Sequence, residues 1–185
     1  MDASKPNHSP SLAATKLVED ADWDAVYEEQ LPRIYNFLRY RVGPDVAEDL
    51  AARVFEKAWV HRRRYRRDLA AFGTWLISIA RHEAIDHIRQ RRRHTGLEEA
   101  ATIVIPGASP EEQLAANQDA ERLRRLLASL AERERELIAL KYGAGLNNRE
   151  IAHLVHLGES NVGTILHRTI RSLREAWDRG ERHER

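Results

Sequence analysis

Two short amphipathic helical patterns separated by a few residues lie within residues 147–174, and this pairing constrains the fold more than any other feature. Asn147 followed three positions later by Glu150 is typical of a capping box at a helix N-terminus. Residues predicted to face inward recur at helical spacing on both sides of the break: Ile151, Ala152, Val155, Val162, Ile165, Leu166, Thr169, Ile170, Leu173 and Trp177. The small Ala152 would let the second helix cross close to the first, so we predict a helix-turn-helix.

The second helix of a helix-turn-helix lies in the major groove of DNA, and its N-terminal residues contact base edges. The residues predicted to point outward there are Glu159, Ser160, Asn161, Gly163, Thr164 and His167. The same spacing would also suit a helical hairpin that binds no DNA. On this second helix, basic residues begin only at Arg168. Attraction to phosphates supplies much of protein–DNA affinity. We therefore expect this segment alone to bind DNA weakly and to need a partner that holds it in place.

The rest of the chain predicts an all-α protein, because helical spacing recurs throughout and strand-like alternation does not persist. The expected helices cover about 23–41, 45–64, 70–93, 110–128, 132–142, 148–155 and 159–178. Gly43-Pro44 should end the first of these, and Asp45 is the expected cap of the second, whose inward face would include Phe55 and Trp59. We predict two small helical domains, 22–93 and 110–180, joined by a flexible linker over 94–109.

Several classes of protein are disfavoured by composition. The 185 residues include no cysteine, which excludes disulfides and thiolate metal sites. There is no apolar run long enough to span a membrane, and residues 1–21 lack the apolar core of a signal peptide. We interpret 1–21 as a disordered lead and expect a cytoplasmic protein. The scattered histidines, with His82 and His87 five positions apart, do not have metal-site spacing, so we expect no metal, cofactor or catalysis.

Positive charge is concentrated in residues 53–93, which hold 12 basic and 4 acidic side chains although the whole chain has a net charge of only +1. Nine arginines crowd two short stretches: Arg62, Arg63, Arg64, Arg66, Arg67, Arg89, Arg91, Arg92 and Arg93. Such runs can be solvated helix ends, but so many neighbouring cations repel one another unless a polyanion neutralises them. Tyr65, Trp75 and His82 are interleaved with this charge and suit stacking on unpaired bases, although core packing explains most of Trp75 equally well.

Motifs in both halves resemble the extracytoplasmic-function (ECF) sigma factors, the two-domain branch of the sigma-70 family. VAEDLAARVFEKAW (46–59) is similar to the segment that binds core polymerase, and FGTWLISIARHEAIDHIRQRRR (72–93) to the segment that opens the promoter. LLASLAERERELIALKYGAGLNNREIAHLV followed by NVGTILHR resembles the domain that binds the −35 element. The resemblance covers about residues 23–178.

The resemblance implies three sets of functional residues and no chemistry catalysed by this chain. Core-polymerase contacts would come from the outer face of helix 46–59: Glu48, Asp49, Phe55 and Glu56. The melted −10 strand would be captured by Arg62, Arg63, Arg64, Tyr65, Arg66, Arg67, Trp75, Arg81, His82 and Arg89. The −35 duplex would be read by Arg149, Glu159, Ser160, Asn161, Thr164, His167, Arg168 and Arg171. The implied partners are core RNA polymerase, promoter DNA and an anti-sigma factor.

The chain departs from the family pattern at a few of these positions. Family members often have Gln at the position of Ala52, Asn at that of His82, and Lys or Arg at those of Gly163 and Ile165. Gly is usual in the interhelical turn where His156 stands, and His tolerates a left-handed conformation at some cost. The main alternative is a stand-alone helix-turn-helix repressor. It would leave the basic block at 62–93 and the linker unexplained.

Overall fold

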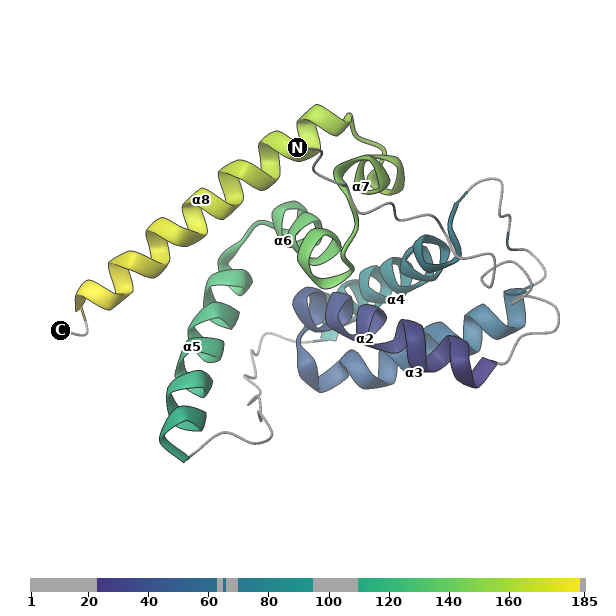
Figure 1. The fold of residues 1–185 in the computed structure, drawn as a ribbon, viewed down its shortest axis with the longest axis horizontal. Helices are drawn as coiled ribbons and strands as arrows, with labels where there is room; N and C mark the ends of the chain where they lie inside the picture. The colour runs from purple at the N-terminus through teal and green to yellow at the C-terminus, as the bar shows by residue number, and fades with distance from the viewer. Residues whose placement is uncertain (1–22, 63–64, 66–69, 95–109, 184–185) are drawn as a thin grey trace, which may run out of the picture.

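The computed structural model describes residues 23–62, 65, 70–94 and 110–183, and every regular element in these ranges is helical (Figure 1). The first helical group consists of α2 (Trp23–Val42), α3 (Pro44–His61) and α4 (Phe72–His94). The second helical group consists of α5 (Pro110–Ser129), α6 (Glu132–Ile138), the π-helical turn η2 (Ala139–Gly143), α7 (Asn148–Val155) and α8 (Glu159–His183). The all-α prediction is thus confirmed. The predicted N-terminal lead and linker residues 95–109 lie outside the described residues, as do Arg63, Arg64, Arg66 and Arg67.

The break between α2 and α3 has a different cap from the one that the sequence predicted. Gly43 is the N-cap residue of α3 and adopts φ +96°, a backbone conformation that L side chains rarely take. Pro44 follows at the first helical position, where its missing N–H costs no hydrogen bond. Asp45 lies in the first turn of α3 instead, where its negative charge interacts favourably with the helix dipole. The prediction that Asp45 caps the helix was therefore wrong.

The three helices of the first helical group share an apolar core. Its largest fully buried members are Ile34, Phe37 and Leu38 of α2, Val54 of α3, and Leu76 and Ile77 of α4. Trp59 was predicted to face this core but is 47 % exposed. Its ring lies beside the N-terminal end of α2 and packs edge-on against Trp23 with a centroid distance of 5.0 Å.

The helix-turn-helix predicted from residues 147–174 is present in α7 and α8. Both hydrogen bonds of the capping box form: the Glu150 N–H donates to Asn147 Oδ1 at 2.9 Å, and the Asn147 N–H donates to Glu150 Oε2 at 2.8 Å. His156 ends α7 with φ 55° and ψ 48°, the left-handed conformation. Helices α7 and α8 contact each other, and Ala152 and Val162 are almost completely buried.

The two helical groups pack against each other through α2, which contacts both η2 and α6. A single helix had been predicted over 132–142, but the helix widens into a π-turn, in which the Ala144 N–H donates to the Ala139 carbonyl at 2.9 Å. This turn carries Gly143 to the backbone of α2: a Cβ added there would lie 2.9 Å from the Asn36 carbonyl oxygen. The sequence did not predict this contact.

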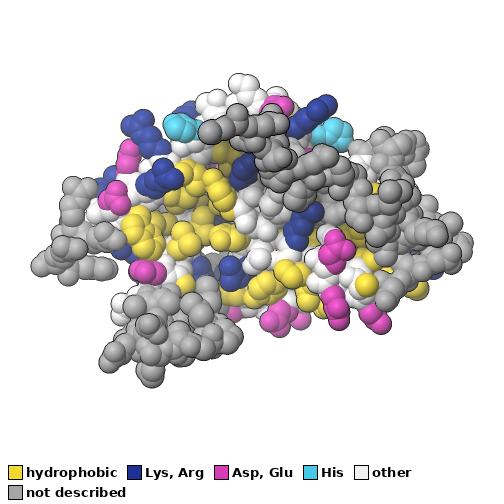
Figure 2. Space-filling view, viewed as in Figure 1, with side chains coloured by type: hydrophobic (Ala, Val, Ile, Leu, Met, Phe, Trp, Pro, Cys, Tyr) yellow, Lys and Arg dark blue, Asp and Glu magenta, His cyan; other side chains and the backbone are white. Residues whose placement is uncertain are grey.

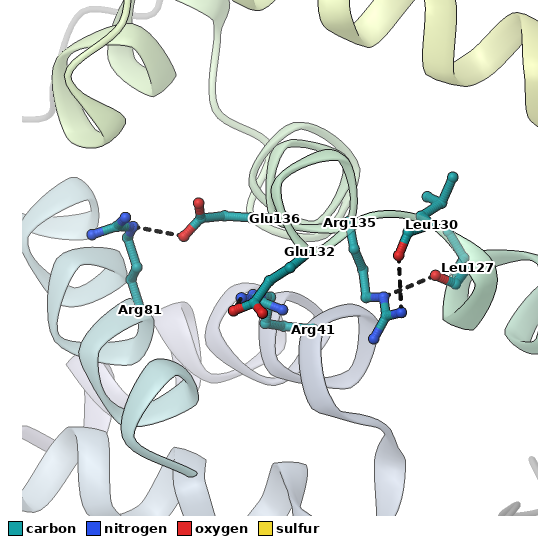
Figure 3. Close-up of polar contacts among 7 residues, drawn as sticks. All are labelled: Arg41, Arg81, Leu127, Leu130, Glu132, Arg135 and Glu136. Atoms are coloured by element: carbon teal, nitrogen blue, oxygen red, sulfur yellow. Dashed lines mark hydrogen bonds and ion pairs between the residues drawn. The ribbon is translucent and has the colours of Figure 1, made fainter. Parts of the chain in front are cut away.

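Helix α6 lies between the first helical group and α5 and contacts both (Figures 1 and 3). Its carboxylates Glu132 and Glu136 reach the first helical group, where they pair with Arg41 and Arg81. On its other side, Arg135 donates from Nε to the Leu127 carbonyl at 2.8 Å, at the C-terminal end of α5. The free carbonyl groups at a helix C-terminus interact favourably with a cation. Arg135 therefore stabilises the contact between α6 and α5.

Candidate DNA-binding and docking surfaces

The N-terminal half of α8 presents a polar face to solvent. The candidate −35 residues that the structure leaves exposed are Arg149 on α7 and, on α8, Glu159, Ser160, Asn161, Thr164, His167, Arg168 and Arg171. Val162, Leu166 and Thr169 on the same helix are buried against the rest of the second helical group. The structure therefore brings all eight candidates to the surface of one motif, with the apolar side of α8 turned inward.

Two polar side chains of this face already have partners within α8. The Thr164 hydroxyl donates to the Ser160 carbonyl at 2.9 Å, which leaves the Thr164 oxygen free to accept. Arg171 Nε pairs with Glu175 Oε1 at 2.9 Å, with both side chains largely exposed. A surface pair of this kind contributes at most about 1 kcal/mol, so Arg171 can exchange it for a phosphate at small cost.

Gly163 lies where α8 crosses the start of α7. A Cβ at this position would be 3.4 Å from Asn148 Nδ2, which is ordinary van der Waals contact. The crossing of the two helices therefore does not require glycine at 163. Because glycine has no side chain, position 163 adds no charge to the surface of α8.

Aromatic side chains at Tyr65 and in the first turn of α4 form a compact cluster. Tyr65 lies 5.3 Å from both Phe72 and Trp75, measured between ring centroids, and its hydroxyl donates to the Ala70 carbonyl at 3.0 Å. Tyr65 and Trp75 are both half-buried, whereas Phe72 is buried. This arrangement supports both interpretations of Trp75, because part of its ring packs inward and part remains open.

Arg62 is held in place at the end of α3. Its Nη1 donates to the Trp59 carbonyl at 2.7 Å, and its guanidinium carbon lies 3.9 Å from the centroid of the Trp59 ring. A cation over an indole face is stabilised by the ring quadrupole. Arg62 and the half-exposed Trp59 therefore form a preorganised cation–aromatic pair beside the loop.

The three candidates on α4 differ in availability. Arg89 is exposed, with only a distant contact of 3.8 Å to Asp86. His82 is exposed, and its Nδ1 lies 2.6 Å from the Ser78 carbonyl, so Nδ1 carries the proton that this contact needs. Arg81 is only 22 % exposed and its Nε pairs with Glu136 Oε1 at 2.8 Å. In this arrangement Arg81 is engaged by the second helical group.

The outer face of α3 combines acidic and aromatic side chains. Glu48, Asp49 and Glu56 are exposed, and acidic side chains gather along this edge of the molecule, over α2 and α3 (Figure 2). Phe55 does not lie on the outer face as expected: it is 7 % exposed and packs against Tyr27 with a centroid distance of 4.6 Å. Helical spacing correctly predicted that Phe55 faces inward, and the outward position that the resemblance implied was wrong, because the ring turns toward α2.

Sequence reasoning missed two apolar members of this face, Trp59 and Val60, which are 47 % and 63 % exposed. Helical spacing alone could have indicated Val60, since it lies four residues beyond the exposed Glu56. We use the name α3 face for Glu48, Asp49, Glu56, Trp59 and Val60. On this surface of the first helical group, charged and large apolar side chains are exposed side by side.

A charged groove separates α3 from α4, lined in part by Arg53, Lys57 and His87. Lys57 forms an ion pair with Glu83, whose side chain is almost fully buried. Burial lowers the pKa of His87 below its usual 6.5, and the positive charges of Arg91 and Arg53 lower it further. His87 therefore favours its neutral form here.

Neither a metal centre nor a membrane span is found in the part of the chain that the structure describes. No three His, Cys, Asp or Glu side chains come close enough there to hold a metal ion. No helix in the same residues has the length and apolar character needed to cross a bilayer.

Each of the two helical groups matches a separate model of a known protein family. Residues 26–94 match the family model of sigma-70 region 2, and residues 120–173 match that of sigma-70 region 4. These two segments, in this order, define a sigma factor of the sigma-70 class.

Two individual relatives show to which branch of the sigma-70 class the chain is similar. The ECF RNA polymerase sigma factor ShbA of Streptomyces griseus is 30 % identical over 132 residues, which cover 69 % of this chain and 69 % of ShbA. The ECF RNA polymerase sigma factor SigM of Bacillus subtilis is 26 % identical over 165 residues, which cover 87 % of this chain and 98 % of SigM. The chain belongs to the ECF family of RNA polymerase sigma factors, the proteins that direct transcription initiation at promoters.

A solved structure shares the fold. The sigma factor RpoE from Bartonella quintana, in complex with the anti-sigma factor NepR, superposes with a TM-score of 0.70 at 21 % identity. The match covers 85 % of this chain and 97 % of that chain. At this identity the likeness concerns the arrangement of helices and not the function of particular residues.

Proposed function

We propose that this chain binds core RNA polymerase through the α3 face and directs it to promoters through two separate DNA contacts. Residues 22–93 would form the unit that binds polymerase and melts the −10 element. Residues 110–180 would form the unit that reads the −35 element. The polymerase carries out the chemistry and this chain catalyses no reaction. It acts in the cytoplasm, where polymerase and promoter DNA are found.

The observation that carries the proposal is the exposure of the polar N-terminal face of α8. Five candidate base-reading residues are exposed there together: Glu159, Ser160, Asn161, Thr164 and His167. Hydroxyl and amide side chains can hydrogen-bond to base edges in the major groove. These five residues include no Lys or Arg, so they would contribute discrimination between sequences more than affinity. Attachment to polymerase would raise its effective concentration at the promoter and compensate for weak binding.

The first helical group is suited to a melted strand rather than to intact duplex. Tyr65 and Trp75 have partly open rings, and a base that leaves the helix can stack on such a ring for about 1–3 kcal/mol. Arg62 over Trp59 and the exposed Arg89 supply cations for the phosphates of that strand. The sequence has further basic residues at positions 63, 64, 66 and 67, which would supply more cations.

The α3 face has the composition of a docking surface. Its half-exposed Trp59 is the kind of large aromatic anchor that contributes most at protein interfaces, and acidic neighbours would favour a basic partner surface. An anti-sigma factor is proposed as a second protein partner. The support is that the structurally similar RpoE of Bartonella quintana is found with the anti-sigma factor NepR.

The decisive test is reconstitution with core RNA polymerase, followed by sequencing of transcript starts from genomic DNA. Initiation at a defined promoter set that core polymerase alone does not use is expected. Binding to bare promoter duplex should be weak without polymerase. Tight binding by the free chain, together with no initiation above core polymerase, would instead favour the repressor.

The role of α8 is tested by Ser160→Ala with Ser172→Ala as the matched control, since both serines are exposed on this helix. Ser160→Ala should change initiation at promoters that depend on their −35 sequence, whereas Ser172→Ala should leave it unchanged. The α3 face is tested by Asp49→Lys, with Glu28→Lys on α2 as the control. Equal core-polymerase affinity of these two variants would count against docking through α3.

A further inference from the structure

Two exposed side chains on the polar face of α8 can only accept hydrogen bonds from DNA. Glu159 is the first residue of α8, and an ionised carboxylate has no proton to donate. The hydroxyl of Thr164 already donates its proton to the Ser160 carbonyl at 2.9 Å, so only the lone pairs of Thr164 Oγ1 remain. Both side chains are exposed, and each therefore requires a donor on the base that it meets.

No basic side chain accompanies these two acceptors in the first two turns of α8. Gly163 lies between them, and the first basic residue of the helix, Arg168, follows roughly 13 Å beyond Glu159 along the helix axis. Arginine and lysine read guanine through its O6 and N7 acceptors, which is the commonest specific base contact. The first two turns of α8 therefore have no side chain of the type that usually selects guanine.

Only two bases present a donor in the major groove. Cytosine offers its N4 amino group, and adenine offers its N6 amino group beside the N7 acceptor. Guanine offers the acceptors O6 and N7, and thymine offers the acceptor O4 and a methyl group, so neither can donate to an acceptor on the protein. A carboxylate is also repelled by the N7 acceptor of adenine, which leaves cytosine as the base that suits Glu159.

The negative charge of Glu159 strengthens this discrimination. Among the residues that the structure describes, none forms an ion pair with Glu159. Such a carboxylate is repelled by the DNA phosphates and loses water when the interface forms. Both costs arise at every sequence, and a base with an amino group offsets them. Glu159 would therefore act mainly by rejecting the wrong bases.

We infer that this chain reads its −35 element through hydrogen-bond acceptors: Glu159 selects a cytosine, Thr164 Oγ1 selects a cytosine or an adenine, and both reject guanine and thymine. This inference rests on the proposed placement of α8 in the −35 duplex. The other exposed side chains of this face, Ser160, Asn161 and His167, have both donors and acceptors and impose no such rule. The two acceptors would therefore set the bases at two positions of the element.

Glu159 also has a structural role that the test must separate from base reading. A carboxylate in the first turn stabilises a helix through the helix dipole, and this contribution exists without DNA. Glu159→Gln keeps the shape of the side chain and gains an amide donor, which can meet guanine O6 or thymine O4. Loss of helix stabilisation would lower binding to all sequences alike, whereas loss of base reading changes which base is preferred.

The base preference is measured with the full chain bound to core RNA polymerase and a promoter library in which the −35 element is randomised. Sequencing the templates that support initiation gives the enrichment of each base at each position. The parent should enrich cytosine over thymine about tenfold at one position, as expected for one good base contact. Glu159→Gln should remove most of this enrichment. Asp178→Asn, which removes a carboxylate from an exposed position far along α8, should retain it.

Thr164 is tested in the same library by Thr164→Val, which keeps the branched shape and removes Oγ1. The enrichment of cytosine and adenine at a second position should fall about fivefold. Ser172→Ala removes an exposed hydroxyl from the same helix and should leave that enrichment unchanged. Circular dichroism of every variant establishes that helical content is retained. An unchanged preference in Thr164→Val would overturn the role of Oγ1.

A second assay separates this inference from the proposed function. The randomised element is offered as a short duplex to the free chain at low salt, where weak binding becomes measurable. Selection of cytosine that is lost in Glu159→Gln would support acceptor reading even without polymerase-dependent initiation, and that lack of initiation would refute only the proposed function. Unchanged base preferences in Glu159→Gln, or a preference of the parent for guanine or thymine at the affected position, would overturn acceptor reading. Initiation by the parent would leave the sigma-factor role intact in that case.

Discussion

The guanidinium of Arg41, whose side chain is only 2 % exposed, pairs with the Glu132 carboxylate at 3.0 Å between Nη2 and Oε1. Arg41 belongs to the last turn of α2 and Glu132 to the first turn of α6, so the pair joins the two helical groups. The partners are unequally placed, since the Glu132 side chain is 40 % exposed. Loss of the carboxylate would leave the buried cation without this acceptor.

Glu132→Ala is therefore expected to destabilise the protein by about 1–3 kcal/mol, the usual cost of leaving a buried polar group unsatisfied. Urea unfolding followed by circular dichroism measures this change. Glu134→Ala is the control, because it removes another acidic residue from the first turn of α6 and so matches the loss of helix-dipole stabilisation. Equal stabilities of the two variants would show that the Arg41 pair contributes nothing.

His156→Gly should leave the stability unchanged or raise it by up to about 1 kcal/mol, because glycine takes a left-handed conformation without the Cβ penalty but has more conformational freedom when unfolded. The residue has φ 55° and an exposed side chain, so no packing is lost. His153→Gly, at an exposed position inside α7, should instead lower stability by roughly 0.5 kcal/mol. A clear drop in the melting temperature of His156→Gly would contradict this explanation of the turn.

Gly163→Lys is expected to strengthen promoter binding by the polymerase complex. The new Cβ is accommodated 3.4 Å from Asn148 Nδ2, and the ammonium would reach the phosphates flanking α8. The slope of log affinity against log salt should steepen by about one, as for one added phosphate contact. Ser172→Lys adds the same charge further along α8, and an identical effect there would indicate general electrostatic attraction.

The lowered pKa of His87 predicts a pH dependence of stability. Because its folded-state pKa lies below the unfolded value of 6.5, the folded protein binds fewer protons in the interval between them. Stability associated with neutral His87 is thus present above about pH 6.5 and is lost as pH falls through the folded-state pKa. Arg53→Ala should raise the His87 pKa toward 6.5, measured from its ring resonances by NMR. An unchanged pKa would mean that Arg53 has no effect on it.

Local features of this chain were predictable because their causes lie within a few residues. The capping box of Asn147 and Glu150 depends only on a three-residue spacing, and both of its hydrogen bonds form. The break after α2 follows from Gly43-Pro44, although which residue caps α3 was mispredicted because the left-handed φ of Gly43 was not anticipated. The exposed polar face of α8 follows from helical periodicity in the same way.

Features that depend on neighbours far along the chain were not predictable from spacing. Periodicity placed both Phe55 and Trp59 inside, but only Phe55 is buried, whereas Trp59 is 47 % exposed. The residue type could not predict burial here, because an aromatic ring suits a core and a docking surface equally well. Only the packing of α2 against α3 decides between the two.

The sequence by itself therefore determined the helices, the helix-turn-helix and the concentration of arginine beside the aromatic loop. It did so because hydrogen bonding, capping and charge repulsion act between residues that are close along the chain. The tertiary structure alone decided that Glu136 holds Arg81 and that Gly143 touches the α2 backbone. Such contacts join segments about 55 residues apart or more in the chain, and they depend on distances of a few tenths of an ångström that helical periodicity does not encode.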